Sequence, residues 1–298
     1  MSMRGARRSP TRRRLLAGGT ALTLGLTALL AGNAATAATA SDTTSGRGPG
    51  PAAVVFVDDF DGPAGAPVDS AKWRPDPGDN ASNAELQYYT DGTQNAQLDG
   101  AGNLVITATP ENAANHQCYY GTCQYTSARL NTAHTFAAEY GRVEARIKLP
   151  QGQGIWPAFW MLGTDFADVG WPASGEIDIM ELVGHEPGTV HGTVHGPGYS
   201  GAEGIGSGYT LPGGASFADD FHTFAVDWTP DRLVWSVDGQ VFHELTPADL
   251  GGDPWVFNKP FFMILNVAVG GHWPGPPDDT TSFPQRMVVD YVRVTTNG

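Results

Sequence analysis

The segment Gly141–Leu149 alternates strictly between apolar and charged residues, and this alternation restricts the fold more than any other feature of the chain. A period of two places successive side chains on opposite faces of a β-strand, one face buried and the other solvated. Short apolar or alternating segments recur along the chain, and none has a sustained helical period. We expect further strands at Val54–Phe60, Asn103–Ala108, Val190–His195, His222–Trp228, Leu233–Val237, Phe261–Val269 and Met287–Val294.

The composition favours an all-β protein with many turns. The chain has 298 residues, of which 39 are Gly, 22 are Pro and 41% are hydrophobic. Such a length can bury a sizeable core, and about 250 residues is usual for one all-β domain. The sequence contains no internal repeat, nucleotide-binding glycine loop or heptad. The simplest architecture is a β-sandwich of two curved antiparallel sheets, formed by residues 53–298 as a single domain.

The first forty residues have the pattern of an export signal. Six arginines accompany an apolar segment, Leu15–Ala31, and Ala38–Ala40 offers an Ala-x-Ala cleavage site. We expect residues 1–40 to be the signal peptide of a secreted, extracellular protein and residues 41–52 to be a flexible lead-in. Residues 11–16 resemble a twin-arginine signal, and the general secretory route is the alternative. An uncleaved membrane anchor is a further alternative, against which the short apolar segment argues.

Removal of this signal would make the protein strongly acidic. Six of the 17 basic residues would be lost and none of the 31 acidic ones, which leaves a net charge of about −20. Such a protein repels nucleic acids and anionic membranes and disfavours strongly anionic polysaccharides. A neutral polysaccharide fits the charge better. We expect no nucleic-acid partner and, after signal cleavage, no membrane partner.

The segment Gly175–Gly184 places three carboxylates in an otherwise apolar sequence rich in β-branched residues. A period of two puts Glu176 and Asp178 on one face, and a β-bulge near Met180 would return Glu181 to that face. Two carboxylates that act on a sugar between them are what glycoside hydrolysis requires. A solvated acidic strand face or a calcium site is the alternative. These residues alone do not distinguish a retaining from an inverting mechanism.

Further motifs accompany this acidic segment in a fixed order. They are Asn83–Tyr89, Ser127–Leu130, Gly141–Arg146, Gly154–Gly163, Phe221–Trp228, Asn266–Gly271 followed by Trp273–Gly275, and Val289–Val294. Together they resemble glycoside hydrolase family 16, in particular its bacterial laminarinase-like endo-β-1,3-glucanases, from about residue 54 to residue 296. The spacing Glu-x-Asp-x-x-Glu is typical of laminarinases, whereas the lichenases of the family have Glu-x-Asp-x-Glu.

The resemblance implies both a fold and a chemistry. The fold would be a jelly-roll β-sandwich, similar to concanavalin A, with a concave substrate cleft. Glu176 would be the nucleophile, Glu181 the general acid/base, and Asp178 the residue that orients and tunes them. The reaction would be a double displacement with retention, and no cofactor would take part in catalysis.

Aromatic and polar residues are the candidates for binding sugar, because sugar rings stack on Trp and Tyr and their hydroxyls need polar partners. The aromatic candidates are Trp156, Trp160, Trp171, Trp273 and Tyr88, with core packing as the alternative. The polar candidates, which match family positions lining the cleft, are Asn83, Glu85, Arg129 and Asn266, with hydrogen bonding in turns and at strand edges as the alternative.

Two histidines four residues apart, His191 and His195, invite a metal interpretation. On a strand, however, such residues lie about 13 Å apart, so they cannot share one zinc ion. We expect His195 to hydrogen-bond the substrate or Glu181, and a buried structural histidine is the alternative.

One calcium ion and one disulfide complete the expectations. The resemblance implies a structural Ca2+ held by Asp59, the backbone carbonyl of Gly102 and Asp290, and oxygen ligands fit calcium chemistry. Aspartate at residue 59 stands where glutamate is commoner in the family, which would weaken this site. Cys118 and Cys123 are the only cysteines, and export would allow them to form a disulfide.

The function that we expect is a secreted, monomeric endo-glycosidase that hydrolyses internal β-1,3-glucosidic bonds of laminarin-type β-glucans. A relative that acts on mixed-linkage β-1,3-1,4-glucan or another neutral polysaccharide, such as agar, is one alternative, and a transglycosylase is another. A non-catalytic glucan-binding lectin is the third, against which the intact glutamate pair argues.

Overall fold

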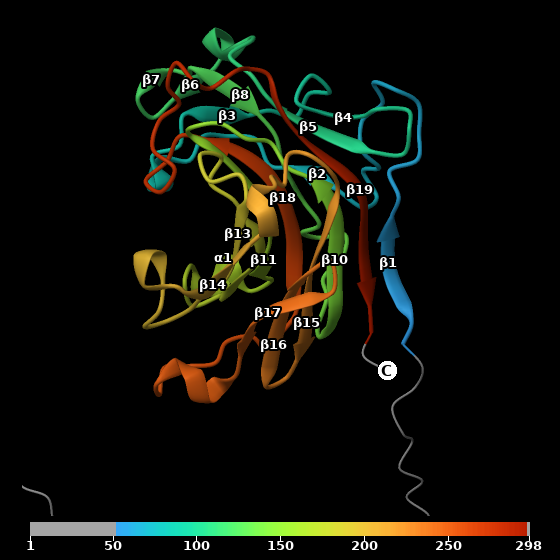
Figure 1. Ribbon diagram of the computed structural model, residues 1–298, viewed down its shortest axis with the longest axis vertical. Coiled ribbons are helices and arrows are strands. Elements are labelled where there is room, and N and C mark those ends of the chain that lie inside the picture. Colours follow the sequence, from blue (N-terminus) through green and yellow to red (C-terminus); the bar gives the residue numbers. More distant parts are fainter. Residues whose placement is uncertain (1–51, 297–298) are drawn as a thin grey trace, which may run out of the picture. The chain divides into compact units, whose positions relative to one another are not determined.

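The computed structural model describes residues 52–296, in which two antiparallel β-sheets pack against each other (Figure 1). The predicted signal peptide, residues 1–40, lies outside the described residues, as does the lead-in up to residue 51. Within residues 52–296, none of the helices has the length and the apolar character that crossing a membrane requires.

The first sheet has eight strands and contains both ends of the described chain. Its strands are β1 (Val54–Asp58), β4 (Ala96–Leu98), β5 (Leu104–Ala108), β10 (Gly141–Lys148), β15 (His222–Thr229), β16 (Arg232–Val237), β17 (Gln240–Leu245) and β19 (Gln285–Thr295). Their order is β17-β16-β15-β10-β19-β5-β4, and β1 also pairs with β19, so the first and last strands lie side by side (Figure 1).

The second sheet has seven strands and contains the acidic segment. Its strands are β2 (Arg74–Pro75), β9 (Arg129–Asn131), β11 (Ile155–Gly163), β12 (Glu176–Glu181), β13 (Thr189–His195), β14 (Ile205–Thr210) and β18 (Phe261–Val269). Their order is β14-β13-β12-β11-β18-β9-β2, which places the acidic strand β12 inside the sheet between β11 and β13.

Short elements connect the two sheets. Two small two-stranded pairs are formed by β3 (Gln87–Tyr89) with β8 (Tyr125–Ser127), and by β6 (Gln117–Cys118) with β7 (Gly121–Thr122). The helical elements are α1 (Phe166–Val169) and the 3-10 helices η1 (Ala81–Asn83), η2 (Ala113–Asn115), η3 (Gly201–Glu203), η4 (Pro212–Gly214) and η5 (Pro247–Leu250).

The alternation in β10 produces the expected buried face. Val143, Ala145 and Ile147 are fully buried between the sheets, while the charged residues between them are partly exposed. Facing residues such as Phe159 of β11 and Leu265 of β18 complete the apolar layer. Each such Val, Ile, Leu or Phe side chain stabilises the fold by roughly 1.5–3 kcal/mol through burial. The predicted all-β jelly-roll sandwich is confirmed, and all eight predicted strands are present with small differences at their ends.

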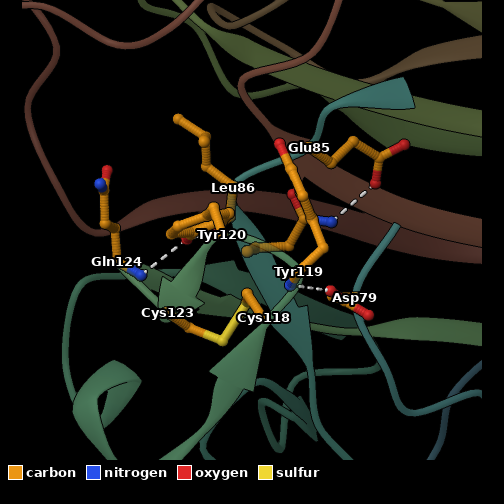
Figure 2. Close-up of a disulfide and its surroundings, with 9 residues drawn as sticks. Asp79, Glu85, Leu86, Cys118, Tyr119, Tyr120, Cys123 and Gln124 are labelled. Atoms are coloured by element: carbon orange, nitrogen blue, oxygen red, sulfur yellow. Dashed lines mark hydrogen bonds between the residues drawn. A yellow bond between two sulfur atoms is a disulfide. The ribbon is translucent and has the colours of Figure 1, made fainter. Parts of the chain in front are cut away.

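The predicted disulfide is also present, with an S–S distance of 2.03 Å between Cys118 and Cys123. Figure 2 shows that the loop between the two cysteines contacts the segment that leads into β3. The backbone N–H of Tyr119 donates to an Asp79 carboxylate oxygen at 2.5 Å, and the Tyr120 hydroxyl donates to the carbonyl of Leu86. These two hydrogen bonds therefore hold the disulfide loop against residues 79–86.

Candidate active site

The acidic strand β12 has one more residue than the segments of β11 and β13 that pair with it. Asp178 pairs with Trp160 of β11 and Met180 pairs with Phe159, so Ile179 has no partner on β11. The register against β13 shifts at the same place. The β-bulge that the sequence predicts near Met180 is therefore present.

Tryptophan side chains hold the two glutamates of this strand. The Nε1–H of Trp171 donates to Oε2 of Glu176 at 3.0 Å, and the Nε1–H of Trp156 donates to Oε1 of Glu181 at 3.0 Å. Both glutamates are partly exposed, whereas Asp178 is only 3% exposed. The three carboxylates share the face of the seven-stranded sheet that is turned away from the core, which we call the outer face.

His195, for which we expect a hydrogen bond to the substrate or to Glu181, lies beside Asp178 in the structure. Its Nε2 is 3.2 Å from Oδ2 of Asp178 and 3.8 Å from Oε1 of Glu176. The strand register explains the difference, because His195 pairs with Glu176 across β12 and β13, while Glu181 pairs with His191. His195 is thus close to Glu176 and Asp178 and is not hydrogen-bonded to Glu181, while its predicted hydrogen bond to the substrate stays a prediction.

Burial raises the pKa of all three carboxyl groups. It raises the pKa of Asp178 to about 8 and that of Glu181 to about 8, and it holds the pKa of Glu176 well above its usual range. Repulsion from Asp178 adds to the raised pKa of both glutamates, while attraction to His195 and the tryptophan hydrogen bonds oppose it. Three negative charges are therefore unfavourable here, and the site retains a proton near neutral pH.

Exposed aromatic rings surround these carboxylates. Trp273 is 43% exposed and packs edge-on against Trp156, with ring centroids 5.7 Å apart. It also contacts the ring of His191 at 5.1 Å. Trp171 is 45% exposed on the Glu176 side. Exposed aromatic rings of this kind can stack on the apolar faces of sugar rings.

Asn266 and Trp160 belong to a buried polar network. The Nε1–H of Trp160 donates to Oδ1 of Asn266 at 2.7 Å, and Nδ2 of Asn266 donates to the Tyr89 hydroxyl at 3.2 Å. That hydroxyl donates to Oε2 of Glu85 at 3.0 Å. Asn266 is 7% exposed, so its amide holds Trp160 in place and has little surface left for other partners.

Glu85 is the centre of this network, and three of its four partners, Asn80, Gln87 and Tyr89, were not among the candidates named from the sequence. Its two carboxylate oxygens accept hydrogen bonds from Asn80 and Asn83, and from Gln87 and Tyr89. Glu85 itself is 3% exposed. The signal was available, because residues 85, 87 and 89 are spaced by two and share one face of an extended segment.

Two predicted binding residues, Asn83 and Arg129, form their hydrogen bonds within this network or beside it and not with the three carboxylates. Asn83 donates to Glu85 at 3.1 Å, and the Nε–H of Arg129 donates to Oδ2 of Asp76 at 2.8 Å. The guanidinium of Arg129 also lies 4.9 Å from the centre of the Tyr89 ring. Tyr88, a further candidate, stacks on His116 beside the disulfide loop.

The predicted calcium ligands come together only in part. A Cβ atom placed on Gly102 would lie 3.8 Å from the carbonyl oxygen of Asp59 and 3.8 Å from a carboxylate oxygen of Asp61. These oxygens suit calcium. The carboxylate of Asp290, however, accepts a hydrogen bond from Arg146 at 2.5 Å, so a metal ion would share that group with a cation. A separate cluster of three side chains that could ligate a metal, among the described residues, is Glu176, Asp178 and His195, whose ligand atoms lie within 4.8 Å of one another.

Comparison with known proteins gives consistent matches. The family model described as Glycosyl hydrolases family 16 matches residues 82–293. The beta-glucanase of Rhodothermus marinus is 42% identical over 253 residues, which cover 81% of this chain and 84% of that protein. Glucan endo-1,3-beta-glucosidase A1 of Niallia circulans is 39% identical over 258 residues, and there the chain spans 37% of the relative's length.

Solved structures agree with these matches. The catalytic domain of the laminarinase from Thermotoga maritima superposes with a TM-score of 0.77 at 48% identity. The match covers 83% of this chain and 99% of that domain. The endo-beta-1,3-glucanase of Pyrococcus furiosus superposes with a TM-score of 0.76 at 49% identity, covering 82% and 94% of the two chains.

Proposed function

The chain belongs to family 16 of the glycosyl hydrolases and is a glycoside hydrolase, and on this basis we propose that it hydrolyses internal β-1,3-glucosidic bonds of laminarin-type β-glucans. The names of the similar glucanases and laminarinases support this substrate. We also propose that residues 53–298 form one catalytic domain of a secreted, monomeric protein whose net negative charge suits a neutral glucan.

The observation that carries the proposal is the pair of glutamates on one face of β12, each with its own tryptophan donor. We assign Glu181 as the general acid, because its raised pKa keeps it protonated near neutral pH. We assign Glu176 as the nucleophile from its place in the motif Glu176-x-Asp178-x-x-Glu181, because burial raises the pKa of both glutamates and each is also contacted by a tryptophan donor and attracted by His195, so the pKa shifts alone do not order the pair.

The reaction then proceeds in two steps with retention of configuration. Glu181 gives its proton to the glycosidic oxygen while Glu176 attacks the anomeric carbon, which releases the leaving sugar and forms a glycosyl-enzyme. Glu181, now ionised, removes a proton from water, and the water oxygen displaces Glu176 from the anomeric carbon. Asp178 repels negative charge on both glutamates and so helps to keep a proton at the site.

Binding of the glucan is assigned to the aromatic rings around these carboxylates. We propose that Trp156, Trp171 and Trp273 stack on sugar rings and that Trp160, held by Asn266, lines the same face. Family-16 hydrolases need no catalytic cofactor. A structural Ca2+ at Asp59, Gly102 and Asp290 remains a proposal, supported by the oxygens gathered around Gly102.

A nucleophile variant tests this function. We expect Glu176→Ser to lower laminarin hydrolysis at least about 1,000-fold, because no carboxylate remains to form the intermediate. Binding of a laminari-oligosaccharide, measured by calorimetry, should remain detectable. Glu203→Ser, on the exposed helix η3, is the matched control and should hydrolyse laminarin like the wild type.

Assays of the wild type on laminarin and on mixed-linkage β-1,3-1,4-glucan distinguish the proposed function from its alternatives. Reducing ends released from laminarin would support the proposal, and release only from mixed-linkage β-1,3-1,4-glucan would move the substrate to that polymer. Binding of laminarin without cleavage by the wild type would favour the lectin. Wild-type activity in Glu176→Ser would show that the nucleophile is assigned wrongly.

A further inference from the structure

The position of Glu181 depends on the bulge in β12. Between the pair Asp178–Thr193 and the pair Glu181–His191, strand β12 advances three residues while β13 advances two. Ile179 and Met180 therefore oppose the single residue Gly192. If the same residues paired regularly, with no bulge, the period of two would turn Glu181 into the core and away from Glu176 and Asp178.

A tryptophan of the opposite sheet reaches this bulge. Trp235 of β16 is fully buried, and its Nε1–H donates to the backbone carbonyl of Asp178 at 2.8 Å. A bulge disrupts the ladder of its strand, and a buried carbonyl without a donor is costly. The Trp235 ring is itself held by His243 of β17, at a centroid distance of 4.8 Å.

Gly192 makes the approach of this ring possible. A Cβ atom on Gly192 would lie 2.5 Å from Cδ1 and 2.9 Å from Nε1 of Trp235, which is closer than side-chain atoms pack. The residue that opposes the bulge thus has no side chain where the indole lies. Trp235, Gly192 and the Asp178 carbonyl form one buried contact between the two sheets, directly beneath the carboxylates.

We propose that Trp235 is a positioning residue that holds the bulge of β12 and so keeps Glu181 on the outer face with Glu176 and Asp178. This role rests on the proposed function for its effect on catalysis. Trp235 contacts no substrate, because it is buried between the sheets. It acts only through the backbone of the strand that carries the carboxylates.

The test is Trp235→Phe, which keeps an aromatic ring and removes the N–H donor. A displacement of about 1 Å at a catalytic group can lower a rate about 100-fold, so we expect kcat on laminarin to fall about 10- to 100-fold with KM within about threefold. The alkaline limb of the pH–rate profile should also shift, because the surroundings of Glu181 change.

Trp228→Phe is the matched control. Trp228 is also fully buried in the eight-stranded sheet, and its Nε1–H also donates to a backbone carbonyl, that of Phe257, at 2.8 Å. The two variants lose the same kind of hydrogen bond. Measured well below the melting temperature of both, the control should keep the kcat and the pH profile of the wild type. Equal kcat and equal pH profiles in the two variants would overturn the proposal.

A second measurement does not depend on the substrate. Amide hydrogen exchange of residues 178–181 should be faster in Trp235→Phe than in the wild type, and unchanged in Trp228→Phe. If the wild type fails to cleave laminarin, the proposed function fails while this exchange experiment still decides whether Trp235 holds the bulge. Unchanged exchange in Trp235→Phe would overturn that role.

Gly192→Ala keeps the proposal testable if Trp235→Phe does not fold. The added methyl group would press on the indole, so kcat and exchange should change as in Trp235→Phe. Gly208→Ala on the neighbouring strand β14 is its control, because a Cβ atom there would lie 3.4 Å from the nearest atom. Identical kcat and identical exchange in the two alanine variants would contradict the proposal.

Discussion

At the scale of single residues, the environment of Glu181 links the proposed chemistry to stability. The carboxyl group is partly exposed on the outer face, and burial together with repulsion from Asp178 raises its pKa to about 8. A general acid has to hold its proton near neutral pH, so this raised pKa suits the assigned role. The same shift has a cost for the folded protein, because the unfolded chain ionises at lower pH.

We therefore predict that Glu181→Gln inactivates the protein and stabilises it at alkaline pH. Between about pH 4.5 and pH 8 the unfolded state loses the Glu181 proton while the folded state keeps it, so wild-type stability falls as pH rises. Glutamine has no proton to lose. If the whole pKa shift contributed, the free energy of unfolding of Glu181→Gln would exceed that of the wild type by about 5 kcal/mol at pH 8. Because water reaches Glu181, we expect a difference of about 1–3 kcal/mol at pH 8 and little difference at pH 4.5.

Urea unfolding of Glu181→Gln and wild type at pH 4.5, 6 and 8 measures this difference. Glu203→Gln, on the exposed helix η3, is the control and should follow the pH dependence of the wild type. A stability difference that does not change with pH would show that the Glu181 carboxyl titrates normally in the folded protein.

The sequence predicted that the three carboxylates share one face of β12, but it did not predict which side chains lie beside them. Glu176 and Asp178 follow from the period of two, and Glu181 follows once a bulge is assumed. The neighbour of His195 could not be predicted, because it depends on the register between β12 and β13 on both sides of the bulge. Cross-strand pairing is a tertiary property, and one residue of shift changes every neighbour.

At the scale of elements, the disulfide loop holds the segment before β3 through two hydrogen bonds. Cys118 and Cys123 close a loop of six residues, which is fastened to Asp79 and Leu86 (Figure 2). Glu85, the centre of the buried polar network, lies between these two residues in the chain. The cysteine spacing predicted the bridge, whereas its contacts with residues 79 and 86 come from distant parts of the chain.

We predict that the double variant Cys118→Ser and Cys123→Ser loses stability and keeps its activity. Closing a six-residue loop stabilises a fold by about 2 kcal/mol, because it restricts the unfolded chain. We expect a melting temperature about 4–8 °C lower and a kcat on laminarin within about twofold of the wild type. Scanning calorimetry and assays at 25 °C measure both. A large loss of activity at that temperature would show that the loop shapes the binding surface.

At the scale of the whole molecule, the net negative charge favours neutral polysaccharides over anionic ones as substrates. The chain carries a formal net charge of −14, and the part after the predicted signal is more acidic still. A sandwich of two sheets was predictable from alternation such as that in β10, whereas the order of the strands within each sheet was not. The long-range pairing that puts β1 beside β19 could not be read from either strand alone.

The negative charge of the protein predicts that kcat/KM depends on salt more strongly for an anionic form of the glucan than for the neutral form. Raising NaCl from about 0.05 to 0.5 M shortens the Debye length and screens repulsion. We expect kcat/KM on carboxymethylated β-1,3-glucan to rise several-fold, and kcat/KM on neutral laminarin to change less than twofold. An equal rise on both polymers would mean that salt acts on the protein and not on its repulsion of the substrate.

The most direct test of the central claim is a proton NMR time course of the purified protein acting on laminarin. The account predicts that β-anomeric reducing ends appear first and that the α-anomer follows by mutarotation, because Glu176 and Glu181 perform two successive displacements. Early α-anomer would contradict the assignment of Glu176 as a nucleophile and require inversion. Absence of new reducing ends would contradict β-1,3-glucan hydrolysis itself.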